Sequence, residues 1–218
     1  MLARPARSAV LPALVLAALS LTMTGCRGNE DKSGEAAPTP AAEMKPQRGG
    51  TVVIAWSAAP TGVNELIVPN TAITTETVRQ LFLHLVSELP DFEEHPPTMA
   101  PQLAESFEFS PDHKILTFHL RKDVVWSDGV PVTADDVRFT WQAHTHPDVA
   151  WNSAYMKEKI KDVEVVDPHT ARFHFSEAYA KQILDVNEGV ILPKHAWGQI
   201  PFPKWRESSE WFLEHLVV

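Results

Sequence analysis

The sequence predicts an α/β fold in which a mixed sheet containing β-hairpins packs against helices. Residues 103–120 and 160–175 each alternate apolar and polar side chains on both sides of a short polar turn. Such alternation indicates paired strands with one buried face. Residues 133–146, between these two stretches, start with a helix-capping pattern and end before a proline. Hairpins that flank a helix in this way predict a sheet with helices packed on it.

The first strand and the first helix are expected upstream of the hairpins. Residues 51–56 form an apolar run, which predicts a strand buried on both faces. Thr74 can cap a helix that ends before Pro90. The residues that predict the buried face of this helix recur at helical spacing and are Val78, Leu81, Phe82, Leu85 and Leu89.

The first hairpin has a turn with an identifiable mechanism. Phe107 and Phe109 stand on one face of the first strand, and alternate apolar residues continue in the second strand. In the turn, Pro111 presets the backbone φ angle of the second turn position, and the Asp112 side chain can bond to its own backbone. The two strands are therefore expected to present one apolar face to a core.

A loop and a helix follow the first hairpin. Residues 126–129, Trp-Ser-Asp-Gly, have strong turn chemistry. Thr133 is a suitable N-cap, and the carboxylates of Asp135 and Asp136 fall in the first helical turn, where the helix dipole favours negative charge. A helix is therefore expected to start near Ala134.

The remaining elements are shorter. Residues 160–166 and 171–175 predict a second hairpin, turned by the Asp-Pro-His-Thr sequence of residues 167–170. Residues 179–187 predict a short helix, and residues 190–192 a short strand or extended segment. This second hairpin is not a clear internal repeat of the first.

Four blocks, taken in order, carry a family resemblance: residues 48–55, 103–129, 133–137 and 190–195. Together they closely resemble the family 5 extracellular solute-binding proteins, which are peptide and dipeptide receptors of ABC importers. The resemblance covers about residues 48–197. A hairpin followed by a capped helix is common architecture, so the order of several blocks is what makes the resemblance specific.

The resemblance implies an incomplete lobe of the type II periplasmic-binding-protein fold, with residues 49–218 as the N-terminal part of a truncated domain. It implies a component that captures peptides outside the cytoplasmic membrane and delivers them to the permease subunits of an ABC importer. Relatives with other cargo leave nickel, a metallophore, an oligosaccharide or an opine as alternative ligands. A truncated remnant without a transport role is a further alternative.

Three residues are candidates for ligand contact. Trp126 beside Asp128 would offer an aromatic platform and a carboxylate to a peptide with a free amino group. The alternative for this loop is structural, with a turn at residues 127–130 and the ring of Trp126 buried against the hairpin. Ser57 follows the first predicted strand, where the resemblance implies that this lobe meets its ligand.

The first residues predict export and a lipid anchor. A short basic region precedes an apolar stretch, residues 9–21, which is short for a membrane span, and a small residue stands before the lone Cys26. Residues 1–25 resemble a lipoprotein signal peptide, which implies lipidation of Cys26 and a periplasmic or extracytoplasmic location. An ordinary secretory signal or an uncleaved anchor is the alternative. Residues 26–48, rich in Pro and polar residues, are expected to be a flexible tether.

Charge and motifs argue against two further function classes. The net charge of -9 disfavours nucleic acid as a partner, because a polyanion is repelled on average. The sequence has no G-x-S-x-G elbow, no phosphate-cradling Gly-rich loop and no H-E-x-x-H helix. The chain is therefore expected to be neither an enzyme nor a protein with a cofactor.

A metal site is the main chemical alternative. His144, His146 and Asp148 place two imidazoles and a carboxylate within five residues, and these are suitable ligands for zinc or nickel. The competing interpretation places both histidines at the C-terminal end of the helix, where the dipole favours partly protonated imidazole and Pro147 ends the helix.

Overall fold

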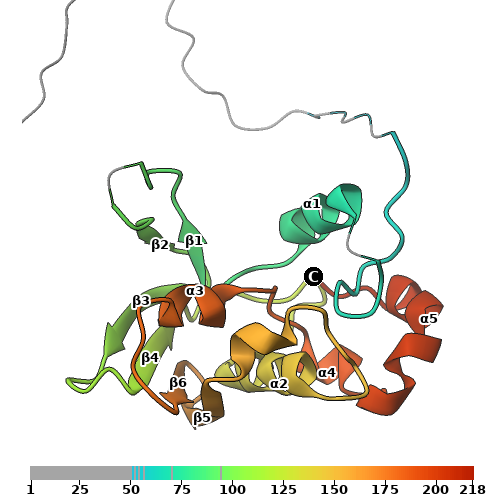
Figure 1. Ribbon diagram of the computed structural model, residues 1–218. Coiled ribbons are helices and arrows are strands. Elements are labelled where there is room, and N and C mark those ends of the chain that lie inside the picture. The colour runs from blue at the N-terminus through green and yellow to red at the C-terminus, as the bar shows by residue number, and fades with distance from the viewer. Residues whose placement is uncertain (1–50, 52, 54, 56, 70, 94) are drawn as a thin grey trace, which may run out of the picture. The chain divides into compact units, whose positions relative to one another are not determined.

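The structure is a computed structural model and describes residues 51, 53, 55, 57–69, 71–93 and 95–218. The chain divides into two units, Met1–Val52 and Val53–Val218, and the elements below all belong to the second unit (Figure 1). In chain order they are α1 (Ala72–Leu81), β1 (Val86–Glu88), β2 (Met99–Pro101), β3 (Ala104–Phe109), β4 (Ile115–Leu120), α2 (Ala134–Thr145), the 3-10 helix η1 (Ala154–Lys157), β5 (Ile160–Asp167), β6 (Thr170–Phe175), α3 (Gln182–Asn187), α4 (Lys194–Trp197), the 3-10 helix η2 (Phe202–Glu207) and α5 (Ser209–Glu214).

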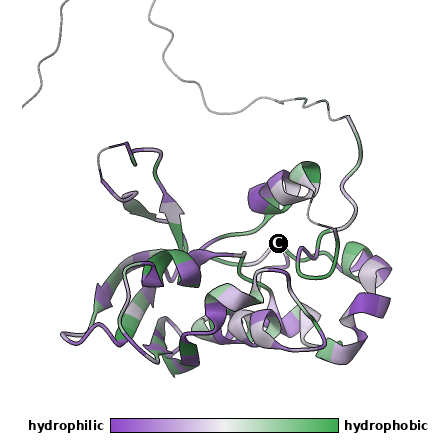
Figure 2. Ribbon diagram, viewed as in Figure 1, coloured by the Kyte–Doolittle hydropathy of each residue, from purple (hydrophilic) through white to green (hydrophobic). Residues whose placement is uncertain are grey.

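The central sheet confirms both predicted hairpins. Its strand order is β3-β4-β6-β5, so β4 and β6 pair at the centre and each hairpin supplies one outer strand. Phe118 of β4 pairs with Phe107 of β3 and with Ala171 of β6, which aligns the apolar positions of neighbouring strands. Hydrophobic and hydrophilic residues alternate along these strands (Figure 2). The alternation gives the sheet one apolar face, on which the core is built.

Every described strand pair is antiparallel, which differs from the expected mixed sheet. The structure describes three residues of the predicted strand at residues 51–56. Its described residues, Thr51, Val53 and Ala55, are exposed and lie in no strand. A strand buried on both faces needs neighbours to accept its backbone hydrogen bonds, and no described segment pairs with these three residues. The α/β fold class itself is confirmed.

Helix α2 packs on the sheet and begins where the sequence predicts. Thr133 precedes the helix, and its backbone N–H donates to the Asp136 carboxylate at 2.8 Å. The buried face of α2 includes Val137, Thr140 and Ala143, and the helix contacts β5 and β6. Pro147 follows the helix end, as predicted.

The prediction for the first helix is wrong at its C-terminal end. Helix α1 ends at Leu81, because the backbone at Phe82 becomes extended, and residues 86–88 form β1 instead of continuing the helix. The competing interaction is tertiary: β1 pairs with β2, and the Leu85 carbonyl accepts from the Ala104 N–H at 2.8 Å. Thr71, rather than Thr74, is the N-cap residue. Helical spacing of apolar residues therefore continued beyond the helix itself.

The last elements form an aromatic core that the sequence did not predict. Trp197, Trp205 and Phe212 are fully buried and come from α4, η2 and α5. The ring centroids of Trp197 and Phe212 lie 4.8 Å apart, and those of Trp205 and Phe212 lie 5.3 Å apart. Phe82 joins this cluster through Trp197 at 5.5 Å. The cluster ties the end of the described chain to the segment that follows α1.

Two shorter predictions have clear outcomes. The short helix expected at residues 179–187 is α3, which begins three residues later than predicted. Residues 190–192 are extended without forming a strand, and the Ile191 N–H donates to the Leu83 carbonyl at 2.8 Å. None of the helices in the described residues is both long enough and apolar enough to cross a membrane.

Candidate functional site

The Trp-Ser-Asp-Gly loop forms the tight turn that its sequence predicts. Gly129 has a φ angle of 86°, and its N–H donates to the Trp126 carbonyl at 2.8 Å. The Asp128 carboxylate accepts from the Val130 N–H at 3.1 Å. Trp126 is only 4% exposed, whereas the Asp128 side chain reaches solvent. The turn therefore buries the ring and presents the carboxylate.

This loop is fixed to two distant parts of the chain. Asp128 Oδ2 lies 2.8 Å from His195 Nε2 of α4, and the hydrogen bond from His195 lowers the pKa of Asp128. Ser127 exchanges two hydrogen bonds with Val218: its N–H donates to the Val218 carbonyl at 2.6 Å, and its Oγ accepts from the Val218 N–H at 3.1 Å. The Asp128 carboxylate is therefore partly used by His195 and partly accessible.

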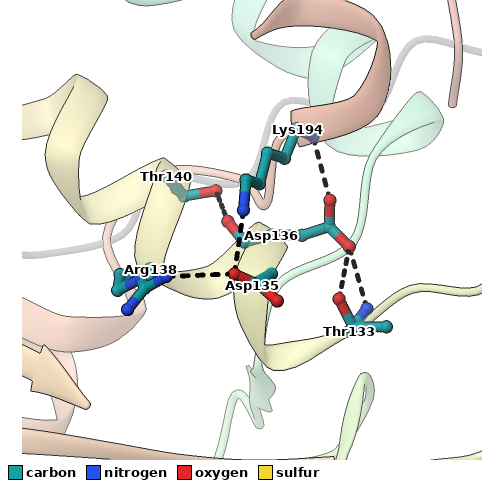
Figure 3. A network of polar contacts seen from close by, with 6 residues as sticks. All are labelled: Thr133, Asp135, Asp136, Arg138, Thr140 and Lys194. Carbon is teal, nitrogen blue, oxygen red and sulfur yellow. Dashed lines mark hydrogen bonds and ion pairs between the residues drawn. The ribbon is translucent and has the colours of Figure 1, made fainter. Parts of the chain in front are cut away.

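The first turn of α2 is the centre of a polar network (Figure 3). The Asp136 carboxylate, in a residue that is 4% exposed, accepts from the Thr133 N–H at 2.8 Å and from the Lys194 N–H at 2.9 Å. One turn later, the Thr140 hydroxyl donates to the Asp136 carbonyl and accepts from the Leu192 N–H at 2.9 Å. Burial raises the pKa of Asp136, and the Thr133 and Lys194 N–H groups oppose that rise. The network holds residues 192–194 against the start of α2.

Asp135, on the outer side of the same turn, makes ion pairs. Its Oδ1 lies 2.9 Å from Lys194 Nζ and 3.2 Å from an Arg138 guanidinium nitrogen. The hydrogen bond from Lys194 is the main cause that lowers the pKa of Asp135. An open pocket of about 420 Å³ lies beside these groups and is also lined by Val130 and His195. Both carboxylates at this helix start thus have structural partners.

The two histidines of the candidate metal site face different surroundings. His144 is 2% exposed and stacks on Trp151 with ring centroids 4.1 Å apart. Burial, and then the charge of Lys157, place the pKa of His144 well below its ordinary value. His146 Nδ1 instead accepts from the Asp148 N–H at 3.2 Å. Among the residues that the structure describes, no group of three His, Cys, Asp or Glu side chains could hold a metal ion.

A buried lysine near His144 was not found from the sequence. Lys157 is 2% exposed, and its Nζ donates to the carbonyls of Asp185, Val186 and Glu188 at 2.5, 2.9 and 2.8 Å. Burial lowers the pKa of Lys157 to about 7. Carbonyls at the end of a helix lack intrahelical partners, so a cation there satisfies them. Lys157 thereby fixes the end of α3 and the turn that follows it.

A second open pocket, of about 500 Å³, lies along β1. The residues that line it come from α1, the β1–β2 hairpin and the end of α3, and they include Arg79, His84, Glu88, Phe92, Asn187 and Glu188. The pocket combines a guanidinium, two carboxylates and an exposed aromatic ring. Sequence reasoning missed it because its walls are more than 100 residues apart in the chain.

The residues predicted for ligand contact lie apart from this pocket. Ser57 is exposed, and neither it nor Trp126 or Asp128 lines the pocket along β1. Their roles stay predictions. Cys26 lies outside the described residues.

Comparison with known proteins identifies one family. The family model for bacterial extracellular solute-binding proteins, family 5 Middle, matches residues 98–218. The periplasmic oligopeptide-binding protein OppA of Escherichia coli (strain K12) is 39% identical over 116 residues, which cover 45% of this chain and 20% of OppA.

Two solved structures share the fold. The oligopeptide-binding protein AppA of Bacillus subtilis, in complex with a nonapeptide, superposes with a TM-score of 0.65 at 26% identity, over 75% of this chain and 31% of AppA. MoaA of A. tumefacien R10, in complex with mannopinic acid, has a TM-score of 0.59 at 26% identity, over 69% of this chain and 30% of MoaA. The chain thus spans about a third or less of the length of these relatives.

Proposed function

The chain belongs to the bacterial extracellular solute-binding proteins of family 5, and on this premise we propose that it captures peptides for an ABC importer. Capture would take place outside the cytoplasmic membrane, and the permease subunits of the importer would receive the peptide. The observation that carries the proposal is the similarity to OppA, an oligopeptide-binding protein, at 39% identity. The structural likeness to AppA with its bound nonapeptide supports the same ligand class.

The proposal includes no bond-making or bond-breaking step. The carboxylates at the start of α2 are used in the fold: Asp136 binds backbone N–H groups, and Asp135 pairs with Lys194. His144 is buried and stacks on Trp151, so its ring has little access to a ligand. These partners favour a binding role, because a catalytic acid or base needs access to a reacting group.

The proposed location follows from the N-terminal sequence. We propose that residues 1–25 direct export, that Cys26 carries the lipid, and that residues 26–48 separate the folded unit from the membrane. The test is metabolic labelling of cells with an alkyne fatty acid. Label is expected on the wild-type chain and not on Cys26→Ser, and equal labelling of both would contradict the anchor.

Peptide capture is tested with the full chain in detergent and a random mixture of tripeptides to pentapeptides. Native mass spectrometry is expected to show retained peptides, and calorimetry with a retained sequence gives its affinity. The matched competitor is the same peptide with an acetylated N-terminus and an amidated C-terminus. Failure of the chain to retain any member of the mixture would contradict peptide capture.

An opine is the second candidate ligand. The observation that favours it is the likeness to MoaA in complex with mannopinic acid. Asp128 and Ser57 are proposed contacts for either ligand, because both present oxygen atoms at the surface of the described unit. Titration with mannopinic acid separates the two candidates: binding of this compound, with no retained peptide, would favour the opine.

A further inference from the structure

The chain turns directly after α3 with the backbone angles of a type II β-turn. Asn187 and Val190 are the outer residues of this turn, and Glu188 and Gly189 are its central pair. Glu188 has φ −66° and ψ 130°, and Gly189 has φ 83°, which match the central pair of a type II turn. This turn type needs a positive φ at its third residue, which glycine adopts at no steric cost. The turn type therefore sets the direction of the peptide group between Glu188 and Gly189.

This central peptide presents its carbonyl to a buried lysine. Lys157 Nζ donates to the Glu188 carbonyl at 2.8 Å and also to the carbonyls of Asp185 and Val186. An ammonium group has three N–H donors and no acceptor, so these three carbonyls use it completely. Because a peptide group is planar and trans, the Gly189 N–H of the same peptide points away from Lys157.

Loss of one proton from Lys157 ends this match of donors and acceptors. A neutral amine has two N–H donors and a lone pair, so one of the three carbonyls would face the lone pair. The carbonyls of Asp185 and Val186 belong to α3, which fixes their direction, and their bonds to Lys157 are buried. The bond to the Glu188 carbonyl is only partly buried and lies outside the helix. The Glu188 carbonyl is therefore the one that can turn away.

Rotation of the central peptide would satisfy the neutral amine. Type I and type II turns differ by a rotation of about 180° of the central peptide, while their outer residues keep their places. In the type I turn the Glu188 carbonyl would point away from Lys157. The Gly189 N–H would point towards Lys157 Nζ, whose lone pair would accept it. Glycine adopts the negative φ of a type I turn as readily as the positive φ seen here.

The outer residues of the turn are held by contacts that do not involve the central peptide. Asn187 Oδ1 accepts from the Val86 N–H at 3.1 Å, and the Asn187 carbonyl oxygen lies 3.2 Å from His84 Nδ1. At the other end, the Val190 N–H donates to Glu65 Oε1 at 3.0 Å. The peptide between these anchors can therefore rotate without loss of either one.

The pH of the change depends on the groups that surround Lys157. Burial lowers the pKa of Lys157 to about 7, against the charges of Glu188, Asp185 and Glu65, which act to raise it. From α2, the imidazole of His144 faces Lys157, and burial and then the Lys157 charge place the pKa of His144 well below its ordinary value. His144 is therefore neutral in the range where Lys157 loses its proton.

We propose that Lys157 and the Glu188–Gly189 peptide form a proton-operated switch. The ammonium form holds the carbonyl of this peptide, and the turn is type II, as in this structure. The neutral amine holds the Gly189 N–H, and the turn is type I. Asn187 and Glu188 line the 500 Å³ pocket along β1, so the switch changes the polar groups in one wall of that pocket with pH. This inference goes beyond the proposed peptide capture and does not depend on it.

Nuclear magnetic resonance of the isotope-labelled full chain in detergent distinguishes the two turn types. With Glu188 ψ at 130°, its Hα lies close to the Gly189 N–H, whereas in a type I turn the N–H groups of Glu188 and Gly189 lie close together. The first nuclear Overhauser effect is expected at about pH 5.5, and the second at about pH 8.5, with a midpoint of about 7. The nitrogen-15 shift of Lys157 Nζ is expected to change with the same midpoint. One turn type at both pH values would overturn the proposal.

Substitutions separate Lys157 from the imidazole at the outer end of the turn, since an imidazole can also change charge between about pH 5 and 8. Lys157→Met removes all three donors and is expected to show one turn type at both pH values. His84→Gln keeps a polar side chain beside Asn187 and is expected to leave the switch and its midpoint unchanged. A switch that persists in Lys157→Met, or that is lost in His84→Gln, would assign the proton to another group and overturn the proposal.

Substitution of Gly189 tests the rotation itself. In the present turn an added Cβ would lie 2.7 Å from His144 Nε2, and alanine disfavours a φ of 83°. Gly189→Ala is therefore expected to show the type I pattern already at about pH 5.5, and Lys157 is expected to titrate at least about 0.5 pH unit lower than in wild type. A type II pattern in folded Gly189→Ala, or an unchanged midpoint, would contradict the link between turn and proton. If circular dichroism shows that this variant is unfolded, the wild-type titration decides.

Discussion

Replacement of Asp136 by alanine tests whether the network at the start of α2 holds the fold together. The carboxylate accepts hydrogen bonds from two backbone N–H groups, those of Thr133 and Lys194. In Asp136→Ala both donors lose their acceptor in a buried setting. The residue is 4% exposed, so water has little access to replace it.

The expected cost follows from these two bonds. Loss of a helix cap costs about 1 kcal/mol, and a buried donor left without a partner costs about 1–3 kcal/mol. The sum is about 2–4 kcal/mol. For a chain of this size, 1 kcal/mol shifts the melting temperature by about 2–4 °C, so Asp136→Ala is expected to lower it by about 5–15 °C.

The matched control is the neighbouring carboxylate. Asp135 pairs with Lys194 and Arg138 at the surface, and exposed ion pairs contribute about 0–1 kcal/mol. Urea denaturation and thermal melts followed by circular dichroism are therefore expected to separate Asp136→Ala from Asp135→Ala clearly. Equal melting temperatures for the two variants would refute the assignment of Asp136 as the buried link between α2 and α4.

Three further predictions follow. The difference in free energy of unfolding between wild type and Lys157→Met should increase from about pH 7 to pH 10. Burial lowers the pKa of Lys157 to about 7, so over this range the unfolded wild-type chain binds a proton that the folded chain does not. The same pH dependence for both proteins in urea denaturation would contradict this. Gly129→Ala should lower the free energy of unfolding by about 1–2 kcal/mol. The cause is backbone strain alone, since φ is 86° and no atom crowds the added methyl group. A melting temperature unchanged from wild type would argue against this strained turn. Phe212→Ala should lower the free energy of unfolding by about 3–5 kcal/mol, because the ring is fully buried. Leu213 is 51% exposed, so Leu213→Ala should lower it by about 0.5 kcal/mol or less. Similar denaturation midpoints for the two variants would contradict the aromatic core.

The elements that the sequence predicted well are those determined by neighbouring residues. In the first hairpin, Asp112 Oδ1 accepts from the Ser110 hydroxyl and from the Lys114 N–H, which is the local turn chemistry expected from the sequence. The start of α2 likewise depends on Thr133 and Asp136, three residues apart. Local signals of this kind are complete within a short stretch of chain.

The wrong boundary of α1 has the opposite cause. Leu85 continues the apolar spacing of the helix, yet its carbonyl accepts from Ala104 and the next residues pair with β2. A contact between residues 19 positions apart decided the local structure, and propensity is a weaker influence than such pairing. The pocket along β1 and the contacts of Lys157 could not be predicted for the same reason, since the residues that form them lie far apart in the sequence.

The residues that identify the family differ from those that would choose a ligand. Asp136 and Gly129, in the blocks that carry the resemblance, have structural tasks: one links two helices, and the other permits a turn. A family is recognisable from such residues because the fold requires them. Arg79 and Phe92, in the pocket along β1, are by contrast exposed and lie outside those blocks. Substitutions at these two positions should therefore leave the melting temperature nearly unchanged while they alter the pocket.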